Sequence, residues 1–114
     1  MTLSLASAKF EIMTHFPPEI TALPEFAGRF TANKLAADNC DVLFATYPAG
    51  TAIEPHIHDT VNIGVVTSGE LYLSVEGAAE LRYGPGDWYH VGAGVSHAAR
   101  FPVETAEIEF WFKS

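Results

Sequence analysis

Apolar residues recur at every second position over much of this chain. In segment 71–75, Leu71, Leu73 and Val75 are each separated by one residue, which is the period of a strand that buries one face. Segment 106–112 alternates in the same way. Further strands are expected at 30–35, 42–47, 53–58, 61–67, 79–83, 88–91 and 96–101.

Turn signals separate these segments at intervals of about 8 to 12 residues, as in sandwiches and small barrels. Prolines at positions 17, 18 and 24 interrupt any long helix in the first third, so no helix longer than a turn or two is expected. Segment 10–13 is a candidate arm strand. The pattern predicts an all-β sandwich or barrel, in which closure protects the strand edges.

The chain has 114 residues, the size of one domain, and its hydrophobic content of 48% is sufficient for a packed core. Its formal net charge is −8 without a cluster of Lys or Arg, which argues against nucleic acid and anionic membranes as partners. No run approaches the ~18 apolar residues of a membrane span. Cys40 is the only cysteine and residues 1–15 lack the features of a signal peptide, so a cytoplasmic location is expected.

Two histidines stand two positions apart in the segment expected as a strand at 53–58. His56 and His58 would leave such a strand on the same face, where two imidazoles can bind one transition metal. His97 follows a glycine-rich turn and is the candidate for a third nitrogen ligand. The alternative is that the pair merely lines a polar strand, because His-x-His alone is a weak signal.

Residues 50–101 resemble the two sequence motifs of the cupin superfamily. In the first motif, a glycine, a His-x-His pair, a glutamate position and a second glycine correspond to Gly50, His56, His58, position 62 and Gly69. The second motif is matched at Gly86, Gly94 and His97. The resemblance implies one cupin domain over 1–114, with an irregular N-terminal arm at about 1–29 and a cupin-type double-stranded β-helix, or jelly-roll barrel, at about 30–114.

The same resemblance implies a metal held by His56, His58 and His97. It also implies a homodimer that pairs through an N-terminal strand and one outer sheet. Phe10, Ile12 and segment 110–112 are the candidates for that interface.

Asn62 stands where the cupin motif has glutamate, Gly92 replaces the motif proline and Phe101 replaces the terminal asparagine. In its ligand set the chain is similar to three-histidine cupins of the cysteine dioxygenase-like and diketone-cleaving dioxygenase-like kinds. Three neutral imidazoles suit Fe, Zn, Ni, Mn or Cu, and the sequence does not choose among them. Asn62 either ligates through its amide oxygen or hydrogen-bonds a metal-bound water or substrate, and we prefer the second role because amide oxygen is a weak donor.

Other residues have both a functional and an ordinary structural interpretation. His90 is a candidate acid–base group near the metal, with a packed histidine as the preferred alternative. Tyr47, Trp88 and Tyr89 either wall a substrate pocket or belong to the core, and Gly64 either leaves room beside the metal or marks a bulge.

The alternation at the end of the chain places Glu107 and Glu109 on one face. We expect that face to be solvated, with a subunit contact as the alternative for Glu109.

Three functions follow. The first is a metal-dependent enzyme on a small organic molecule, dioxygenase-like with iron, or an isomerase or lyase with zinc, nickel or manganese. The second is a non-catalytic module of the same fold that binds a small ligand or a metal. The third is a metal-free barrel, which the missing motif glutamate at Asn62 keeps open. The reaction and the substrate are not determined by the sequence.

Overall fold

Antiparallel strands make up most of the described chain. The computed structural model describes residues 15–28 and 30–113. Within these ranges the elements are α2 (Pro18–Thr21), β1 (Thr31–Ala36), β2 (Cys40–Tyr47), β3 (Thr51–His56), β4 (Val61–Ser68), β5 (Leu71–Val75), β6 (Leu81–Tyr83), β7 (Trp88–Val91), β8 (His97–Phe101) and β9 (Thr105–Phe112). The all-β prediction is confirmed, and the helix α2 is a single turn.

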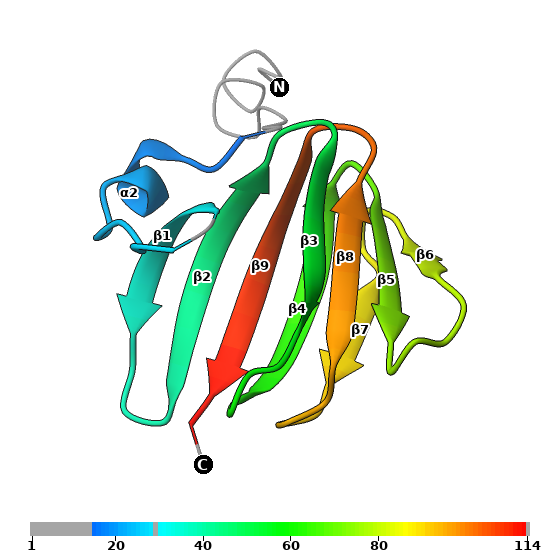
Figure 1. Cartoon of the computed structure of the whole chain (residues 1–114). Coiled ribbons are helices and arrows are strands. Elements are labelled where there is room, and N and C mark those ends of the chain that lie inside the picture. The colour runs from blue at the N-terminus through cyan, green and yellow to red at the C-terminus, as the bar shows by residue number, and fades with distance from the viewer. Residues whose placement is uncertain (1–14, 29, 114) are drawn as a thin grey trace, which may run out of the picture.

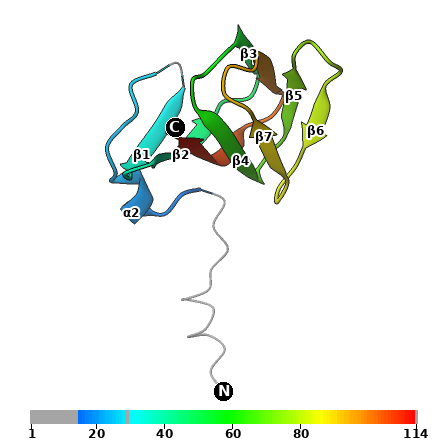
Figure 2. The same ribbon diagram turned by 90° about the horizontal axis from the view of Figure 1, so that it is seen from below.

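Two sheets face each other as the two layers of a jelly roll (Figures 1 and 2). The larger sheet has the strand order β1-β2-β9-β4-β7, and the smaller has the order β3-β8-β5-β6. The last strand, β9, lies between β2 and β4 and pairs antiparallel with both. The C-terminal strand is therefore central in the larger sheet.

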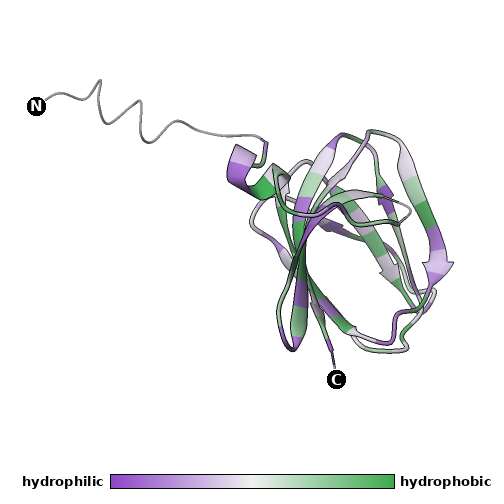
Figure 3. Cartoon of the chain, turned by 90° about the vertical axis from the view of Figure 1, so that its left-hand side faces the viewer, coloured by the Kyte–Doolittle hydropathy of each residue, from purple (hydrophilic) through white to green (hydrophobic). Residues whose placement is uncertain are grey.

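The core lies between the two sheets. On β2 the buried residues Leu43, Ala45 and Tyr47 alternate with partly exposed ones, and Leu71 and Leu73 of β5 face them from the smaller sheet. Along the strands hydrophobic and hydrophilic residues alternate, as the colours of Figure 3 show. Period-two alternation thus sets the inner and outer faces, as expected.

The strand predicted at 53–58 ends earlier than expected. β3 stops at His56, with a register shift against β8 between Ile53 and His56, and His58 lies in the loop that follows. Pro55 has no N–H to donate to the sheet, which accounts for the irregularity. The arm strand predicted at 10–13 lies outside the described residues.

The prediction of a solvated face on the last strand was wrong. Glu107 is 1% exposed and Glu109 is 6% exposed, and both point between the sheets. The opposite face of β9 carries Ile108, Phe110 and Phe112 on the outside of the sheet. Alternation divides a strand into two faces correctly, but it does not say which face is inside.

No helix in the described part of the chain is long and apolar enough to cross a membrane.

Candidate metal centre and its cavity

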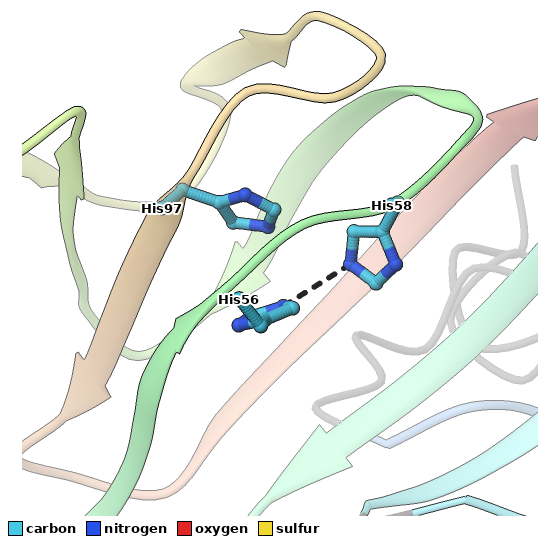
Figure 4. A group of neighbouring side chains, drawn as sticks. All are labelled: His56, His58 and His97. Carbon is cyan, nitrogen blue, oxygen red and sulfur yellow. Dashed lines mark hydrogen bonds between the residues drawn. The ribbon is translucent and has the colours of Figure 1, made fainter.

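Three histidines converge at one end of the smaller sheet. His56 ends β3, His97 begins β8, and these two residues are partners across the β3–β8 ladder. His58 reaches the same place from the loop after β3, and Figure 4 shows the three rings directed toward one space. One nitrogen from each of His56, His58 and His97 lies within 4.8 Å of the other two.

The backbone near His58 is attached to the second glycine-rich turn. The N–H of Gly94 donates to the carbonyl of His58 at 2.7 Å. Gly94 has a positive φ of 73°, a conformation that glycine adopts without steric cost. This contact brings the loop with His58 to the turn that precedes His97.

Backbone carbonyls orient two of the rings. The Nδ1 of His56 lies 2.8 Å from the carbonyl of Glu54, and the Nδ1 of His97 lies 3.0 Å from that of Val95. A carbonyl only accepts, so each Nδ1 carries the ring proton. The Nε2 lone pairs of His56 and His97 are then available for a metal, as in many metal-binding histidines.

The spacing of one pair of histidine nitrogens fits a shared metal. The Nε2 atoms of His56 and His58 are 3.1 Å apart, the contact dashed in Figure 4. Two nitrogens on one ion at ~2.0–2.1 Å are separated by roughly 2.9 to 3.4 Å, depending on the coordination angle. This pair therefore fits a divalent transition metal. The group as a whole spans up to 4.8 Å, against at most ~4.2 Å for two nitrogens on one ion, so the rings must close slightly to share it.

Burial keeps His97 in its ligating form. His97 is buried, and loss of hydration, with a smaller contribution from the neighbouring His56, lowers the pKa of its imidazole, although the hydrogen bond to Val95 raises it. A histidine with a lowered pKa is neutral at neutral pH, which is the state that binds metal.

A cavity of about 290 Å³ opens beside the histidines, between the two sheets. Its walls combine polar and apolar side chains. They include the three histidines, Phe26, Phe30, Tyr47, Ile53, Asn62, Leu71, Leu73, Tyr89, Val91, Ala99, Phe101, Glu107, Glu109 and Trp111. The volume is near the lower end of the ~300–1,000 Å³ range of ligand pockets, so the cavity suits a small molecule.

The larger sheet contributes two buried carboxyl groups to this cavity. The hydroxyl of Tyr89 donates to Oε1 of Glu107 at 2.6 Å. Glu109 is bonded at both oxygens, since the Tyr47 hydroxyl donates to Oε2 and the Trp111 indole donates to Oε1 at 3.0 Å. We call Glu107, Glu109, Tyr47 and Tyr89 the carboxyl wall, and His56, His58 and His97 the histidine wall.

The environment of the carboxyl wall favours the retention of a proton by the pair of acids. Desolvation raises the pKa of Glu107 well above its ordinary value, repulsion by Glu109 adds to this, and the Tyr89 hydrogen bond opposes it. Desolvation also raises the pKa of Glu109, against the hydrogen bonds from Tyr47 and Trp111. The pair therefore retains a proton at pH values where an exposed carboxyl group has lost it.

Gly64 makes room for part of this wall. It lies on β4 opposite Tyr89, and a Cβ at this position would come closer than 3.0 Å to the Tyr89 ring. The glycine therefore leaves space for Tyr89, whose hydroxyl reaches Glu107. The sequence left open whether Gly64 makes room beside the metal or marks a bulge. In the structure it makes room for Tyr89.

Asn62 lies inside the cavity, while His90 does not. The Oδ1 of Asn62 accepts from the Thr60 hydroxyl at 2.6 Å, which leaves its amide N–H groups to donate to a ligand. His90 is exposed on β7, and its neighbours Tyr89 and Val91 line the cavity, so its side chain faces the other way. Its position supports neither the acid–base role near the metal nor a packed histidine.

The three aromatic residues considered for a pocket wall do not all lie in the cavity. Tyr47 and Tyr89 line the cavity, whereas Trp88 is 58% exposed on the outer face.

Glu107 and Glu109 are the functional candidates that the sequence interpretation missed. The available signal was Trp111, a large apolar residue in register with the two glutamates on the same face of the strand. This signal is weak, because the opposite face carries Ile108, Phe110 and Phe112 and is the more apolar of the two. The pairing of the two glutamates with the buried residues Ala45 and Leu43 of β2 decides which face is inside, and this pairing is not visible in the alternation.

Comparisons with known proteins agree with this architecture. A family model described as the cupin domain matches residues 43–111. A search of curated proteins found no match to the chain.

Several solved structures share the fold. An RmlC-like cupin from Shewanella frigidimarina aligns over 90% of this chain and 93% of its own, with 19% identity and a TM-score of 0.73. KdgF from a Halomonas species aligns over 89% and 96%, with 19% identity and a TM-score of 0.68. The DMSP lyase DddQ from Ruegeria pomeroyi aligns over 83% of this chain and 54% of its own, with 24% identity and a TM-score of 0.68.

Proposed function

This chain belongs to the cupin family, and from that premise we propose that it is a metal-dependent enzyme acting on a small organic molecule. His56, His58 and His97 hold one divalent transition metal, and the adjoining cavity takes the substrate. The observation that carries the proposal is the convergence of three histidine nitrogens within 4.8 Å at the wall of a cavity between the sheets.

The bound metal would supply Lewis acidity to oxygen atoms of the substrate. The three protein ligands are neutral, so the site favours an anionic or chelating group at this end of the cavity. Asn62 is positioned to donate a hydrogen bond to such a group, because the Thr60 hydroxyl occupies its carbonyl oxygen. The apolar side chains of Ile53, Leu71 and Leu73 exclude water from the remainder of the substrate.

The identity of the metal decides the class of reaction in this proposal. With iron the site is dioxygenase-like, and with zinc, nickel or manganese it is a lyase or an isomerase. Two similar structures are DMSP lyases, which supports including elimination chemistry among the candidates. The cavity also contains carboxyl groups, which can serve as the acid or base of a proton-transfer reaction.

The test is metal analysis of protein purified without an affinity tag, followed by titration with Fe(II), Zn(II), Ni(II), Mn(II) and Cu(II). We expect about one ion per chain and stabilisation against thermal unfolding. His97→Ala should lose the ion, while the matched control His90→Ala, changed at an exposed histidine, should keep it. Absence of binding and of stabilisation with every metal would leave a metal-free barrel.

Activity assays then separate enzyme from binding module. Oxygen uptake by the iron form with thiols, diketones and phenols tests the dioxygenase class. Loss of absorbance or release of product from oxo and hydroxy acids with the zinc, nickel and manganese forms tests the lyase and isomerase classes. A metal-loaded protein that binds such compounds without turnover would be the non-catalytic module instead.

We also propose a homodimer formed by the outer face of the larger sheet. Phe44, Ile108 and Phe110 lie on this face, with Trp88 stacked on Phe110 and Phe112 at 39% exposure. Light scattering should give twice the chain mass, and Phe110→Glu should shift the measured mass to that of the monomer. A monomeric wild-type protein at micromolar concentration would contradict the proposed dimer.

Two other predictions are not tested by the structure. Phe10 and Ile12 lie outside the described residues, and the cytoplasmic location stays a prediction based on Cys40.

A further inference from the structure

We propose that Glu107 is the proton-transferring residue of the cavity and that its Oε2 oxygen exchanges a proton with the substrate. The substrate class that this role implies is a small oxo acid, with its carboxylate toward the histidine wall and its neutral carbonyl toward Glu107. The inference rests on the proposed function and goes beyond it in naming the acid–base residue and the substrate class.

The hydrogen bonds distinguish the two oxygens of Glu107. Oε1 accepts from the Tyr89 hydroxyl, whereas Oε2 has no hydrogen bond to any residue within the described ranges. Glu107 lines the cavity. The oxygen that the fold leaves uncommitted therefore belongs to a side chain on the cavity wall.

Glu109 has a different role, because both of its oxygens are already bonded to Tyr47 and Trp111. Donors on both oxygens stabilise a carboxylate. Glu109 is two residues from Glu107 on the same face of β9, so a charge on Glu109 favours the proton on Glu107. We assign Glu109 as a positioning residue, which keeps its neighbour protonated.

The groups that share the cavity with Glu107 come from every strand around it. The titratable ones are Glu109 on β9, Tyr47 on β2, Tyr89 on β7, and His56, His58 and His97 from β3, its following loop and β8. The side chains that β4 and β5 direct into the cavity, Asn62, Leu71 and Leu73, carry no charge. Among the described lining residues none is Lys or Arg, so no described cation holds Glu107 in its ionised form.

Glu107 alone can act as both the acid and the base of the reaction, so protons and electrons balance without a second residue. Glu107 donates its Oε2 proton to the carbonyl oxygen of the substrate, and the resulting carboxylate removes a proton from the adjacent carbon. The C–H electron pair becomes the C=C bond, and the π pair of the carbonyl becomes the new O–H bond. Glu107 ends protonated and the product is the enol, so the step is a keto–enol tautomerisation that needs neither an oxidant nor a reductant.

The test measures binding of matched probes to the nickel-loaded protein by calorimetry. The probes are levulinate against succinate and 5-oxohexanoate against glutarate. Each pair keeps the spacing of the two functional groups but replaces a neutral methyl ketone by a second carboxylate. We expect the wild-type protein to prefer each keto acid by about tenfold at neutral pH, because a second carboxylate meets the carboxyl wall. The affinity for the keto acid should fall as the pH rises and Glu107 ionises.

Variants identify the residue responsible. Glu107→Gln should keep the keto acid affinity but lose its fall with pH, because the amide donates a hydrogen bond at any pH. Glu107→Ala should lose most of the affinity, and Glu104→Gln, changed at an exposed glutamate, should behave as wild type. An unchanged pH profile in Glu107→Gln, equal binding of both members of each pair, or binding of no probe overturns the proposal.

Infrared spectroscopy gives a second measurement that needs neither metal nor ligand. The band of a protonated carboxyl group should be present in the wild-type protein at neutral pH and absent from Glu107→Gln. If the protein binds no metal but shows this band, the proposed function fails while the protonation of Glu107 stands. If it binds metal but shows no such band, the assignment of Glu107 is wrong and the metal centre remains.

Discussion

The two walls of the cavity are held in place by different kinds of partner. In the histidine wall, His56 and His97 are oriented by backbone carbonyls only two residues away. In the carboxyl wall, Glu107 and Glu109 are oriented by tyrosine hydroxyls from β7 and β2. One wall is built from local chain geometry at strand ends, and the other from side chains that three strands bring together.

This difference separates binding from folding. A histidine can be removed without leaving a buried polar side chain unpaired, because its partner carbonyl lies near the strand end. Removing a tyrosine hydroxyl of the carboxyl wall leaves a buried carboxyl group without a donor, and such a group destabilises the folded state. We therefore expect changes in the histidine wall to affect metal affinity, and changes in the carboxyl wall to affect stability and its pH dependence.

The largest effect on stability is expected from Gly64→Ala. The added Cβ would lie closer than 3.0 Å to the ring of Tyr89 in the cavity wall, so the ring would have to shift. Overpacking of this kind costs about 1–3 kcal/mol, and displacement of the Tyr89 hydroxyl from Glu107 adds to it. Chemical denaturation of the metal-free protein measures the loss.

Gly84→Ala is the matched control for this substitution. A Cβ at Gly84 would meet only the flexible end of Arg82, at 3.1 Å, so a loss of stability well below that of Gly64→Ala is expected. Equal losses in the two variants would mean that the space for Tyr89 has no special importance.

A smaller loss is expected from Tyr47→Phe. The substitution keeps the ring that stacks on Phe101, with centroids 4.0 Å apart, but removes the hydroxyl that donates to Glu109. An unpaired buried acceptor costs about 1–3 kcal/mol, and we expect the lower half of that range because Trp111 remains as a donor. Thermal and urea unfolding measure it. Tyr72→Phe, on the outer side under Arg100, should have little effect; a similar loss there would remove the special role of the carboxyl wall.

The same contrast explains what the sequence could and could not predict. The histidine wall depends on residues at fixed spacing around glycine turns, so His56, His58 and His97 could be assigned from motif positions. Even there the strand ended at His56, and a loop hydrogen-bonded to Gly94 rather than strand alternation placed His58.

The carboxyl wall depends on which strands flank β9. Alternation placed Glu107 and Glu109 together correctly but assigned them to solvent, because the pattern carries no information on the neighbouring strands. Only the pairing of β9 with β2 and β4 shows that this face looks into the cavity. Tyr47 and Tyr89, which donate to the two acids, lie on β2 and β7. No pattern within the segment around Glu107 and Glu109 could predict these partners.

The pH dependence of stability distinguishes the two walls in the metal-free protein. The folded-state pKa values of Glu107 and Glu109 are raised, so the unfolded chain releases protons that the folded chain keeps. Stability should therefore fall as the pH rises above the ordinary glutamate value toward the folded-state values, by up to about 1.4 kcal/mol per pH unit for each proton. His97 has the opposite sign: its lowered pKa makes stability fall as the pH drops below its ordinary value of 6.5.

Urea titrations of the metal-free wild-type protein and Glu107→Gln between about pH 5 and pH 8 measure both slopes. The variant should lose much of the decline toward high pH and keep the decline toward low pH that His97 causes. A wild-type protein whose stability rises steadily over this range would show that the carboxyl wall is ionised throughout.

The smallest effect is expected from Asn62→Ala, measured as a loss of metal affinity. This variant tests whether a residue of the larger sheet belongs to the metal centre. Asn62 lies on β4, part of the sheet that carries the carboxyl wall, yet its amide is positioned to serve a ligand at the histidines. Competition with a chromophoric zinc chelator should show a loss of affinity of about tenfold or less, typical of a residue that orients a ligand rather than binding the metal. His56→Ala should lose far more, because it removes a nitrogen that the metal contacts. If Asn62→Ala strips zinc as completely as His56→Ala does, the asparagine oxygen is itself a ligand, and the metal centre extends across the cavity onto the larger sheet.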